Sequence, residues 1–189
     1  MVNQHIKELL DEADEHMDKS LDWLRGELNS IRAGRATPTM IENVRVDYYG
    51  SQTPLNQIAS ISAPQPDLLI VQPWDRSALD DVEKGIMAAN MGLNPSNDGA
   101  LIRIPVPPLS EERRRDLVKT AKSRGEEAKI GIRNIRRDVK EKIKKVTDEE
   151  HISEDMQYEG EERLQEITDH YTEVVDKLID RKEKEIMEV

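Results

Sequence analysis

Apolar residues recur at steps of three and four along three long stretches of this chain. The first stretch covers residues 3–33, and its apolar positions are Ile6, Leu9 or Leu10, Ala13, Met17, Leu21, Leu24, Leu28 and Ile31. This spacing places the apolar side chains on one narrow stripe of an α-helix whose other faces are charged. Such a stripe leaves water only when other helices cover it, so the pattern predicts a helical bundle or coiled coil.

Two stretches in the second half of the chain repeat this pattern. Ser110 is the candidate N-cap of the first, whose stripe is Leu117, Ala121, Ala128, Ile132, Ile135, Val139, Ile143 and Val146. A turn at residues 148–151 and the candidate N-cap Ser153 precede the other, whose stripe is Met156, Leu164, Ile167, Tyr171, Val174, Leu178 and, as a further candidate, Val175. The expected helices have roughly 30, 37 and 34 residues, or about 45–55 Å at 1.5 Å per residue. Similar lengths favour an antiparallel three-helix bundle.

Residues 34–109 differ in composition from these helical stretches. All nine prolines lie in this segment, and β-branched residues cluster in short runs at residues 42–49, 57–64, 68–73 and 101–106. Short runs of this kind between Gly and Pro residues predict strands. Residues 77–90 carry an apolar helical face, with Ser77 and Asp80 as a candidate capping box. We therefore expect a small α/β domain at 34–109, inserted into a bundle formed by 1–33 and 110–189.

Two segments, near residues 33–36 and 105–109, are expected to link the inserted domain to the bundle. Glycine ends helices readily, and proline neither donates to a strand ladder nor favours helix before it. Both linkers must leave the bundle at the same end, and paired linkers allow bending while they restrain twisting. The expected hinge residues are Gly34, Arg35, Pro105, Pro107 and Pro108. Arg32 and Arg35 are explained equally well as cations near a helix C-terminus and as binding residues.

The stretch from Arg113 to Lys145 concentrates positive charge in an otherwise acidic chain. It holds fourteen Lys and Arg against five Asp and Glu, a net charge of +9, whereas the whole chain carries −11 at pH 7. This asymmetry indicates a polyanionic partner, above all a nucleic acid. Charge runs are commonly solvated helix faces, and charge alone also allows DNA, a membrane or an acidic protein as the partner.

Five cations of this stretch form one ridge along the expected helix. Lys129, Arg133, Arg136, Lys140 and Lys144 follow each other at steps of four, three, four and four, with Arg137 beside them; these six residues are called the basic ridge. The ridge lies about 100° around the helix from the apolar stripe, so we expect it to face outward. Arginine presents a planar fork that matches phosphate. Because no groove-reading motif accompanies the ridge, we expect recognition of structured RNA through shape and phosphates.

No catalytic or metal-binding constellation stands out in the sequence. The chain has no GxxxxGK[ST] loop, no GxGxxG motif and no cysteine, and its four histidines, His5, His16, His151 and His170, lack ligand spacing. Trp23 and Trp74 are interpreted as packing residues, and Tyr48 and Tyr49 as strand residues. The N-terminus has no apolar signal core, and no apolar run approaches the roughly 18 residues of a membrane span. We expect a cytoplasmic protein that is not an enzyme and has no cofactor, metal or membrane partner.

Six segments carry a resemblance to a known family, in that family's order and spacing. They are IRAGRATP (31–38), DYYGSQTPLNQIAS (47–60), VEKGIMAANMGLNP (82–95), IRIPVPPLSEERRRDLVK (102–119), EEAKIGIRNIRRD (126–138) and ISEDM (152–156). Through these segments the chain resembles the ribosome recycling factor family. The clearest differences are Trp74, where the family has Phe, and a strongly acidic last helix; neither lies on the basic ridge.

The resemblance implies an α+β fold, with a long antiparallel three-helix bundle and an inserted small β/α/β domain in an L-shaped molecule. It implies a factor, which we expect to be a monomer, that binds the large ribosomal subunit across the A and P sites. With elongation factor G and GTP, such a factor splits post-termination ribosomes and releases mRNA and tRNA. The resemblance further implies that Arg114, Arg133 and Arg136 contact rRNA, and the ridge adds Lys129, Arg137 and Lys140 to the expected rRNA-binding residues.

Two other functions remain open from the residues alone. One is a coiled-coil scaffold whose basic ridge meets an acidic protein. The other is the tRNA-binding arm of a multidomain enzyme. The inserted domain with its Pro-bounded linkers argues against a plain scaffold, and the lack of a catalytic domain argues against the arm.

Overall fold

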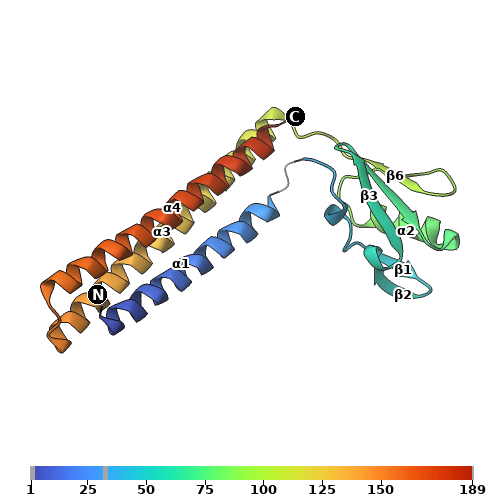
Figure 1. The fold of residues 1–189 in the computed structure, drawn as a ribbon. Coiled ribbons are helices and arrows are strands. Elements are labelled where there is room, and N and C mark those ends of the chain that lie inside the picture. Colours follow the sequence, from blue (N-terminus) through green and yellow to red (C-terminus); the bar gives the residue numbers. More distant parts are fainter. Residues whose placement is uncertain (1–2, 32–33, 189) are drawn as a thin grey trace. The chain divides into compact units, whose positions relative to one another are not determined.

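The computed structural model describes residues 3–31 and 34–188, and the chain divides into two compact units (Figure 1). Residues before 34 and after 110 form a helical unit, and residues 34–110 form a smaller mixed unit. The helical unit contains α1 (Gln4–Ser30), α3 (Glu111–Glu150) and α4 (Glu154–Met187). The smaller unit contains α2 (Leu79–Ala88) and two antiparallel sheets.

Helix α3 runs antiparallel to the other two helices of its unit. Its end lies beside the start of α1, where Glu150 pairs with His5. Helices α1 and α4 run in the same direction, because Gly160 near the start of α4 packs against Ile6 near the start of α1, and further along both helices the Tyr171 hydroxyl donates to Asp14 Oδ1 at 3.0 Å. The three long helices therefore form the antiparallel bundle that the sequence predicts (Figure 1).

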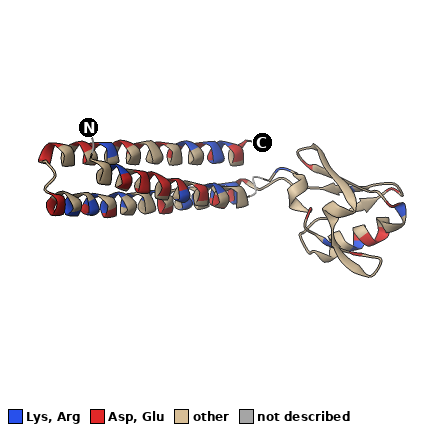
Figure 2. Cartoon of the chain, turned by 60° about the horizontal axis from the view of Figure 1, so that its bottom comes forward, with Lys and Arg blue, Asp and Glu red and all other residues tan. Residues whose placement is uncertain are grey.

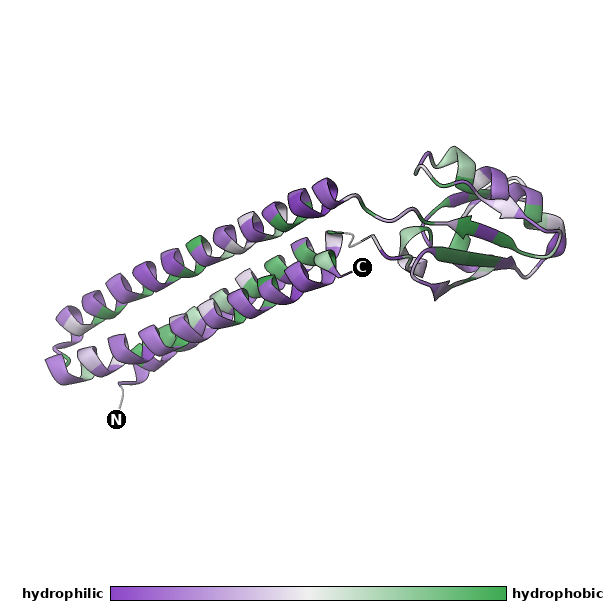
Figure 3. Ribbon diagram, turned by 90° about the horizontal axis from the view of Figure 1, so that it is seen from above, coloured by the Kyte–Doolittle hydropathy of each residue, from purple (hydrophilic) through white to green (hydrophobic). Residues whose placement is uncertain are grey.

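The apolar faces of the three helices meet in one core (Figure 3). Helix α1 contributes its predicted stripe, with Leu10 buried and Leu9 at the edge. In α3 the predicted Leu117, Ile135 and Val146 are only partly buried. The fully buried positions of α3 are Val118, Ala121, Gly125, Ala128, Ile132, Val139, Ile143 and Thr147. The stripe predicted for α3 is thus confirmed in the middle of the helix, whereas at each end the buried residue is the one after the predicted residue.

The predicted stripe of α4 is confirmed only in part. Leu164, Tyr171 and the further candidate Val175 are buried, Ile167, Val174 and Leu178 are partly buried at the edge of the core, and Met156 is exposed. The buried positions are Gly160, Leu164, Thr168, Tyr171, Val175, Ile179, Lys182 and Ile186. These positions follow steps of three and four with more fours than threes, which is the repeat of a straight helix rather than of a strict heptad.

The turn between α3 and α4 is shorter than the sequence predicts. Helix α3 continues to Glu150, so residues 148–150 are helical and not part of the turn. His151 has a φ of +52°, and the Ile152 N–H donates to the Thr147 carbonyl at 3.0 Å. This arrangement closes the end of α3 in the manner of a Schellman motif. Ser153 then caps α4 as predicted, since its Oγ accepts from the Met156 N–H at 3.3 Å.

The smaller unit is built from six strands and α2 among the described residues. Strands β1 (Arg45–Tyr48) and β2 (Ser51–Pro54) form a hairpin, and Gly85 of α2 packs closely on Val46 of β1. The second sheet has the order β3 (Ala59–Gln65), β4 (Leu68–Pro73), β6 (Ile102–Pro105) and β5 (Ser96–Asn97). The unit has its own hydrophobic core, distinct from that of the bundle.

Several local predictions for this unit are wrong. Strands β2 and β5 lie outside the predicted runs, and β1 occupies only part of residues 42–49. Tyr49 lies in the hairpin turn instead of a strand, with a φ of +50° followed by +81° at Gly50, as a two-residue hairpin loop requires. The predicted capping box at Ser77 is replaced by Asp75, whose Oδ1 accepts from the Ser77 N–H at 2.9 Å.

The two tryptophans are surface residues, which contradicts their interpretation as packing residues. Trp23 on α1 is 43% exposed and Trp74 after β4 is 68% exposed. Trp23 follows the stripe residue Met17 by six positions, which is off the helix repeat. Trp74 comes directly after the last residue of β4, where the sheet no longer covers it.

Both linkers of the smaller unit are tied to the same turn. The Ala36 N–H donates to the Pro66 carbonyl at 2.7 Å, and the Val106 N–H donates to the Asp67 carbonyl at 2.7 Å. Gly34 has a φ of +79°, and a Cβ placed on it would lie 2.6 Å from Leu109 Cγ. Pro105 is the last residue of β6 and opposes Leu68. The segments outside these ties are therefore residues 34–35 and 107–110, while Arg32 and Ala33 lie outside the described residues.

Candidate nucleic-acid interface

Half of the basic ridge reaches across to α4. Lys129 pairs with Asp176, and Lys140 Nζ lies 3.3 Å from Glu161 Oε2. Between them, Arg136 Nη1 donates to Gln165 Oε1 at 3.1 Å. The sequence predicts an outward face, whereas the structure places these three side chains along the groove between α3 and α4. The apolar stripe of α3 is shared between α1 and α4, so its flank is close to α4.

Arg133, Arg137 and the exposed Lys144 form the outward part of the ridge. Arg133 is 59% exposed at its side chain, and its Nη2 lies 3.6 Å from Glu126 Oε2 on the same helix. The Arg137 guanidinium is exposed and donates to Asn134 Oδ1 at 3.4 Å. Both guanidinium groups contact α3 itself and keep one face toward solvent. They are the ridge residues that a phosphate backbone reaches without displacing a contact to α4.

Arg114 stands apart from the ridge. It lies in the first turns of α3, about 22 Å of helix before Lys129 at 1.5 Å per residue. Its side chain is half-buried, and its Nε has no hydrogen-bond acceptor among the described residues. The structure therefore does not bring Arg114 together with the ridge, and the two would contact different parts of a long partner.

The charges of the neighbouring helix oppose those of the ridge. Helix α3 has fourteen basic and ten acidic residues, whereas α4 has five basic and twelve acidic ones. Figure 2 shows the two signs side by side along the bundle. The hydrogen bond from Lys129 to Asp176 raises the pKa of the Lys129 ammonium above its usual range, so this cation stays charged. Any polyanion that binds the ridge competes with α4 for these cations.

A pocket of about 270 Å³ opens in this groove. Its lining is formed by Arg136, Lys140, Tyr158, Glu161, Glu162, Leu164 and Gln165. Tyr158 is 72% exposed and is the residue of this site that the sequence analysis missed. The only available signal was an aromatic residue off the apolar repeat of the last helix.

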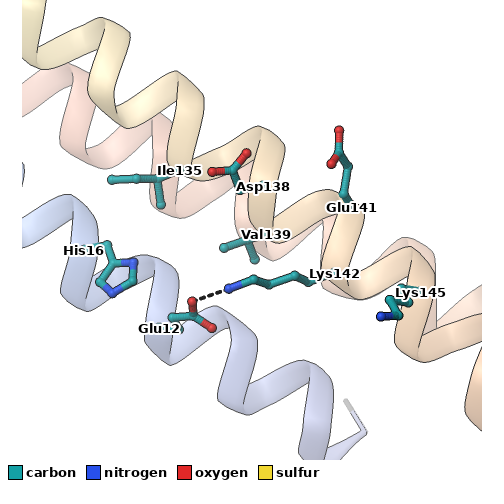
Figure 4. A pocket seen from close by; sticks show the side chains of 8 residues that line it. All are labelled: Glu12, His16, Ile135, Asp138, Val139, Glu141, Lys142 and Lys145. Atoms are coloured by element: carbon teal, nitrogen blue, oxygen red, sulfur yellow. Dashed lines mark hydrogen bonds and ion pairs between the residues drawn. The ribbon is translucent and has the colours of Figure 1, made fainter.

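A second groove lies between α1 and α3 and is larger, with a volume of about 430 Å³ (Figure 4). Its lining is formed by Glu12, His16, Ile135, Asp138, Val139, Glu141, Lys142 and Lys145. Glu12 and Lys142 pair across it. Three carboxylates face two lysines in this groove, so its charge disfavours a polyanion. The groove beside α4 is the better candidate for contact with nucleic acid.

The described residues contain neither a candidate metal-binding cluster nor a candidate membrane span. No group of three or more His, Asp or Glu in this part of the chain could hold a metal ion. Within the same residues, no helix is long and apolar enough to cross a membrane. The four histidines are exposed, with His5 and His16 on α1, His170 on α4 and His151 in the α3–α4 turn.

Comparison with known proteins extends over the whole chain. The family model described as "Ribosome recycling factor" matches residues 24–187. A ribosome-recycling factor of Salinibacter ruber is 59% identical over 189 residues, covering 100% of both chains. One of Clostridium novyi is 48% identical over 184 residues, covering 97% of this chain and 100% of its own.

Two solved structures are similar over their full lengths. The solution structure of a ribosome recycling factor is 39% identical, with a TM-score of 0.72 and 100% coverage of both chains. The other combines models for the T. thermophilus ribosome recycling factor and the E. coli elongation factor G bound to the E. coli post-termination complex. It is 45% identical, with a TM-score of 0.60 and the same coverage.

Proposed function

The chain belongs to the ribosome recycling factor family and acts in ribosome recycling, and from this premise we propose how its two units divide the work. The observation that carries the assignment is the 59% identity to a ribosome-recycling factor along the entire chain. Because the chain belongs to this family, it is interpreted neither as a coiled-coil scaffold nor as the tRNA-binding arm of a multidomain enzyme. The division into a long bundle and a smaller linked unit supplies the parts that a mechanical factor needs.

The bundle is the anchor in this proposal. It binds the large ribosomal subunit across the A and P sites through rRNA phosphates. Arg133 and Arg137 make the outward contacts, and Lys129, Arg136 and Lys140 contribute at the edge of the α3–α4 groove. Arg114 adds a separate contact near the start of α3. The exposed guanidinium groups support this role, because their planar forks match phosphate oxygens.

The smaller unit is the lever in this proposal. Its linkers are tied to the turn at Pro66 and Asp67, so among the described residues the segments left for bending are 34–35 and 107–110. Gly34, Arg35, Pro107 and Pro108 lie in these short segments, whereas Pro105 marks where β6 ends and the stiff part begins. Because these segments are short, a force on the smaller unit is transmitted to the bundle and does not merely extend a long flexible linker.

The force comes from elongation factor G in this proposal. A similar structure pairs a ribosome recycling factor with elongation factor G on the post-termination complex, and we assign the same partner to this chain. The partner hydrolyses GTP, so the chain itself need not be an enzyme and needs no cofactor of its own. In this proposal it acts as a monomer in the cytoplasm. The factor itself then needs only stiffness, a hinge, and different affinities for the intact and the divided ribosome.

Light scattering of purified post-termination ribosomes tests this function. Scattering should fall, as ribosomes divide into subunits, when the protein, elongation factor G and GTP are present together. Omission of any one component is the control and should leave scattering high. Equal splitting without elongation factor G, or none with all three components, would contradict the proposal.

A further inference from the structure

An exposed aromatic residue, Tyr158, lies beside the basic ridge. Tyr158 is 72% exposed, whereas the bundle's other tyrosine, Tyr171, is buried and bonded to Asp14. In the described part of the chain, Tyr158 has no side-chain hydrogen bond and no ring contact. Aromatic side chains usually gain stability from burial. The exposed ring of Tyr158 therefore contributes little to the bundle and is available to a partner.

The ring stands at a groove of suitable size. Tyr158 of α4 and the cations Arg136 and Lys140 of α3 line the same pocket of about 270 Å³. The pocket also includes the almost fully buried Leu164. Pockets for drug-sized ligands begin at about 300 Å³, so this one suits a single ring system.

The charges of the groove distinguish a base from a phosphate. Glu161 and Glu162 lie in the same lining as Arg136 and Lys140, so the four charges cancel. Because the groove has no net charge, it does not attract a phosphate, whereas the outer face at Arg133 and Arg137 is positively charged and does. A neutral base with amino groups fits better, because carboxylate oxygens accept hydrogen bonds from exocyclic amines.

The groove is also held in shape by its own contacts. Glu161 Oε1 accepts from Gln157 Nε2 at 3.0 Å, while its Oε2 faces Lys140. Gln165 accepts from Arg136 and donates to Asp169 Oδ1 at 2.8 Å. These side chains are therefore held in place in the free protein, and each of their oxygens keeps a second lone pair for a ligand, which lowers the cost of ordering them on binding.

We propose that the Tyr158 groove between α3 and α4 holds one unpaired, amino-bearing base of rRNA, stacked on the Tyr158 ring. Single-stranded RNA is commonly bound by aromatic rings that stack on splayed bases beside backbone-binding cations. The ridge fixes the phosphates, and the groove adds a contact that depends on an unpaired base. This inference rests on the proposed binding of the ridge to the large subunit.

Two variants of Tyr158 test the inference. Tyr158→Leu removes the ring, and the matched control Tyr158→Phe keeps it; both change an exposed position, and circular dichroism verifies the fold. Binding to purified large subunits is measured across a series of salt concentrations. Tyr158→Leu should bind about tenfold more weakly at every salt concentration, since stacking does not depend on counterions. Tyr158→Phe should bind as the unchanged protein does.

Arg133→Ala separates the failure of the inference from the failure of the proposed function. This variant should weaken binding and also flatten the dependence of log K on log salt, because one phosphate contact is lost. If Arg133→Ala has this effect and Tyr158→Leu has none, only the base site is overturned. If neither variant changes binding, the ridge itself is wrongly assigned.

Chemical probing of the rRNA gives the second measurement. One unpaired A, C or G should be protected by the unchanged protein and by Tyr158→Phe, and should react again with Tyr158→Leu. Normal subunit binding by Tyr158→Leu together with lost splitting would instead assign the ring to a protein partner and overturn the inference.

Discussion

At the scale of single residues, the basic ridge is two sets of cations rather than one. Arg133, Arg137 and Lys144 face solvent, whereas Lys129, Arg136 and Lys140 already contact acidic or amide groups of α4. The spacing of the ridge could be read from the sequence, because it depends on one helix alone. The contacts to α4 could not be predicted, because they depend on how two helices pack, as for Arg136 and Gln165, which lie 29 positions apart in the chain.

Arg136→Ala tests the groove side of the ridge. The substitution should weaken binding to the large subunit by roughly 1–3 kcal/mol, the range for a hydrogen bond to a charged group. Helicity should stay nearly intact, because the side chain lies outside the apolar core. Sedimentation with large subunits measures the affinity, and Arg181→Ala, an exposed arginine elsewhere on α4, is the control. Equal affinities in the two variants would remove Arg136 from the binding surface.

Tyr171 predicts how the bundle responds to alkaline pH. Burial first, and the hydrogen bond to Asp14 second, raise the pKa of the Tyr171 hydroxyl from 10.0 to about 12. The protonated hydroxyl is thus favoured by folding, so its contribution is fully present below pH 10 and is lost as the pH rises toward 12. Urea unfolding should show the free energy of unfolding falling by roughly 2 kcal/mol relative to Tyr171→Phe across this range. A constant difference between the two proteins would show that the hydroxyl titrates normally.

At the scale of elements, two glycines set how closely the helices approach. A Cβ on Gly160 of α4 would lie 2.6 Å from Ile6 Cγ2, and one on Gly125 of α3 would lie 2.7 Å from Ile179 Cγ1. Neither glycine is needed for its backbone conformation, since both lie inside helices. They are small residues at contact points, which lets β-branched side chains of the facing helix fill the core.

Gly160→Ala should therefore destabilise the bundle although alanine is the better helix former. Its methyl group meets a stiff β-branched side chain, and overpacking of this kind costs about 1–3 kcal/mol, more than the gain in helix propensity of about 1 kcal/mol. Gly26→Ala is the matched control, because a Cβ there meets nothing within 4 Å. Thermal unfolding should show a lower Tm for Gly160→Ala and a higher one for Gly26→Ala. A rise in both would mean that Ile6 yields without cost.

The same contacts explain which helices could be predicted from sequence. The α1 stripe is apolar at every buried position, so its periodicity identifies it directly. In α4 the buried set includes Gly160, Thr168 and Lys182, which an apolar pattern does not count. Thr168 is buried because its hydroxyl donates to the Leu164 carbonyl at 2.8 Å, and Lys182 because it pairs with Glu185 at 3.4 Å. The sequence pattern did not predict the short strand β2 for a related reason, because its residues Ser51 and Gln52 are polar and exposed.

At the scale of the whole molecule, the proposed lever can be locked at one place. A Cβ on Gly34 would lie 3.4 Å from Leu109 Cβ, close to the roughly 3.5–4.5 Å of a disulfide. Because the chain has no cysteine, Gly34→Cys with Leu109→Cys creates a single pair across the two linkers. Cysteine at the positive φ of residue 34 costs on the order of 1–3 kcal/mol.

The oxidised double variant should bind the large subunit normally and fail to split ribosomes. The ridge is untouched by the cross-link, whereas the two linkers lose their independent motion. Light scattering with elongation factor G and GTP measures splitting, and the same protein in its reduced form is the control for the substitutions. Full splitting by the oxidised protein would refute the lever.

The adjoining ends of the smaller unit have a consequence for how the chain folds. Helices α1 and α3 can meet only after residues 34–110 have been looped out between them. If that unit folds first, Gly34 and Leu109 are already neighbours, and the loop left to close is only a few residues long. The saving in loop-closure entropy is about 2 kcal/mol. The unit that we propose as a lever in the finished protein would thus act during folding as a clasp, which brings α1 and α3 together.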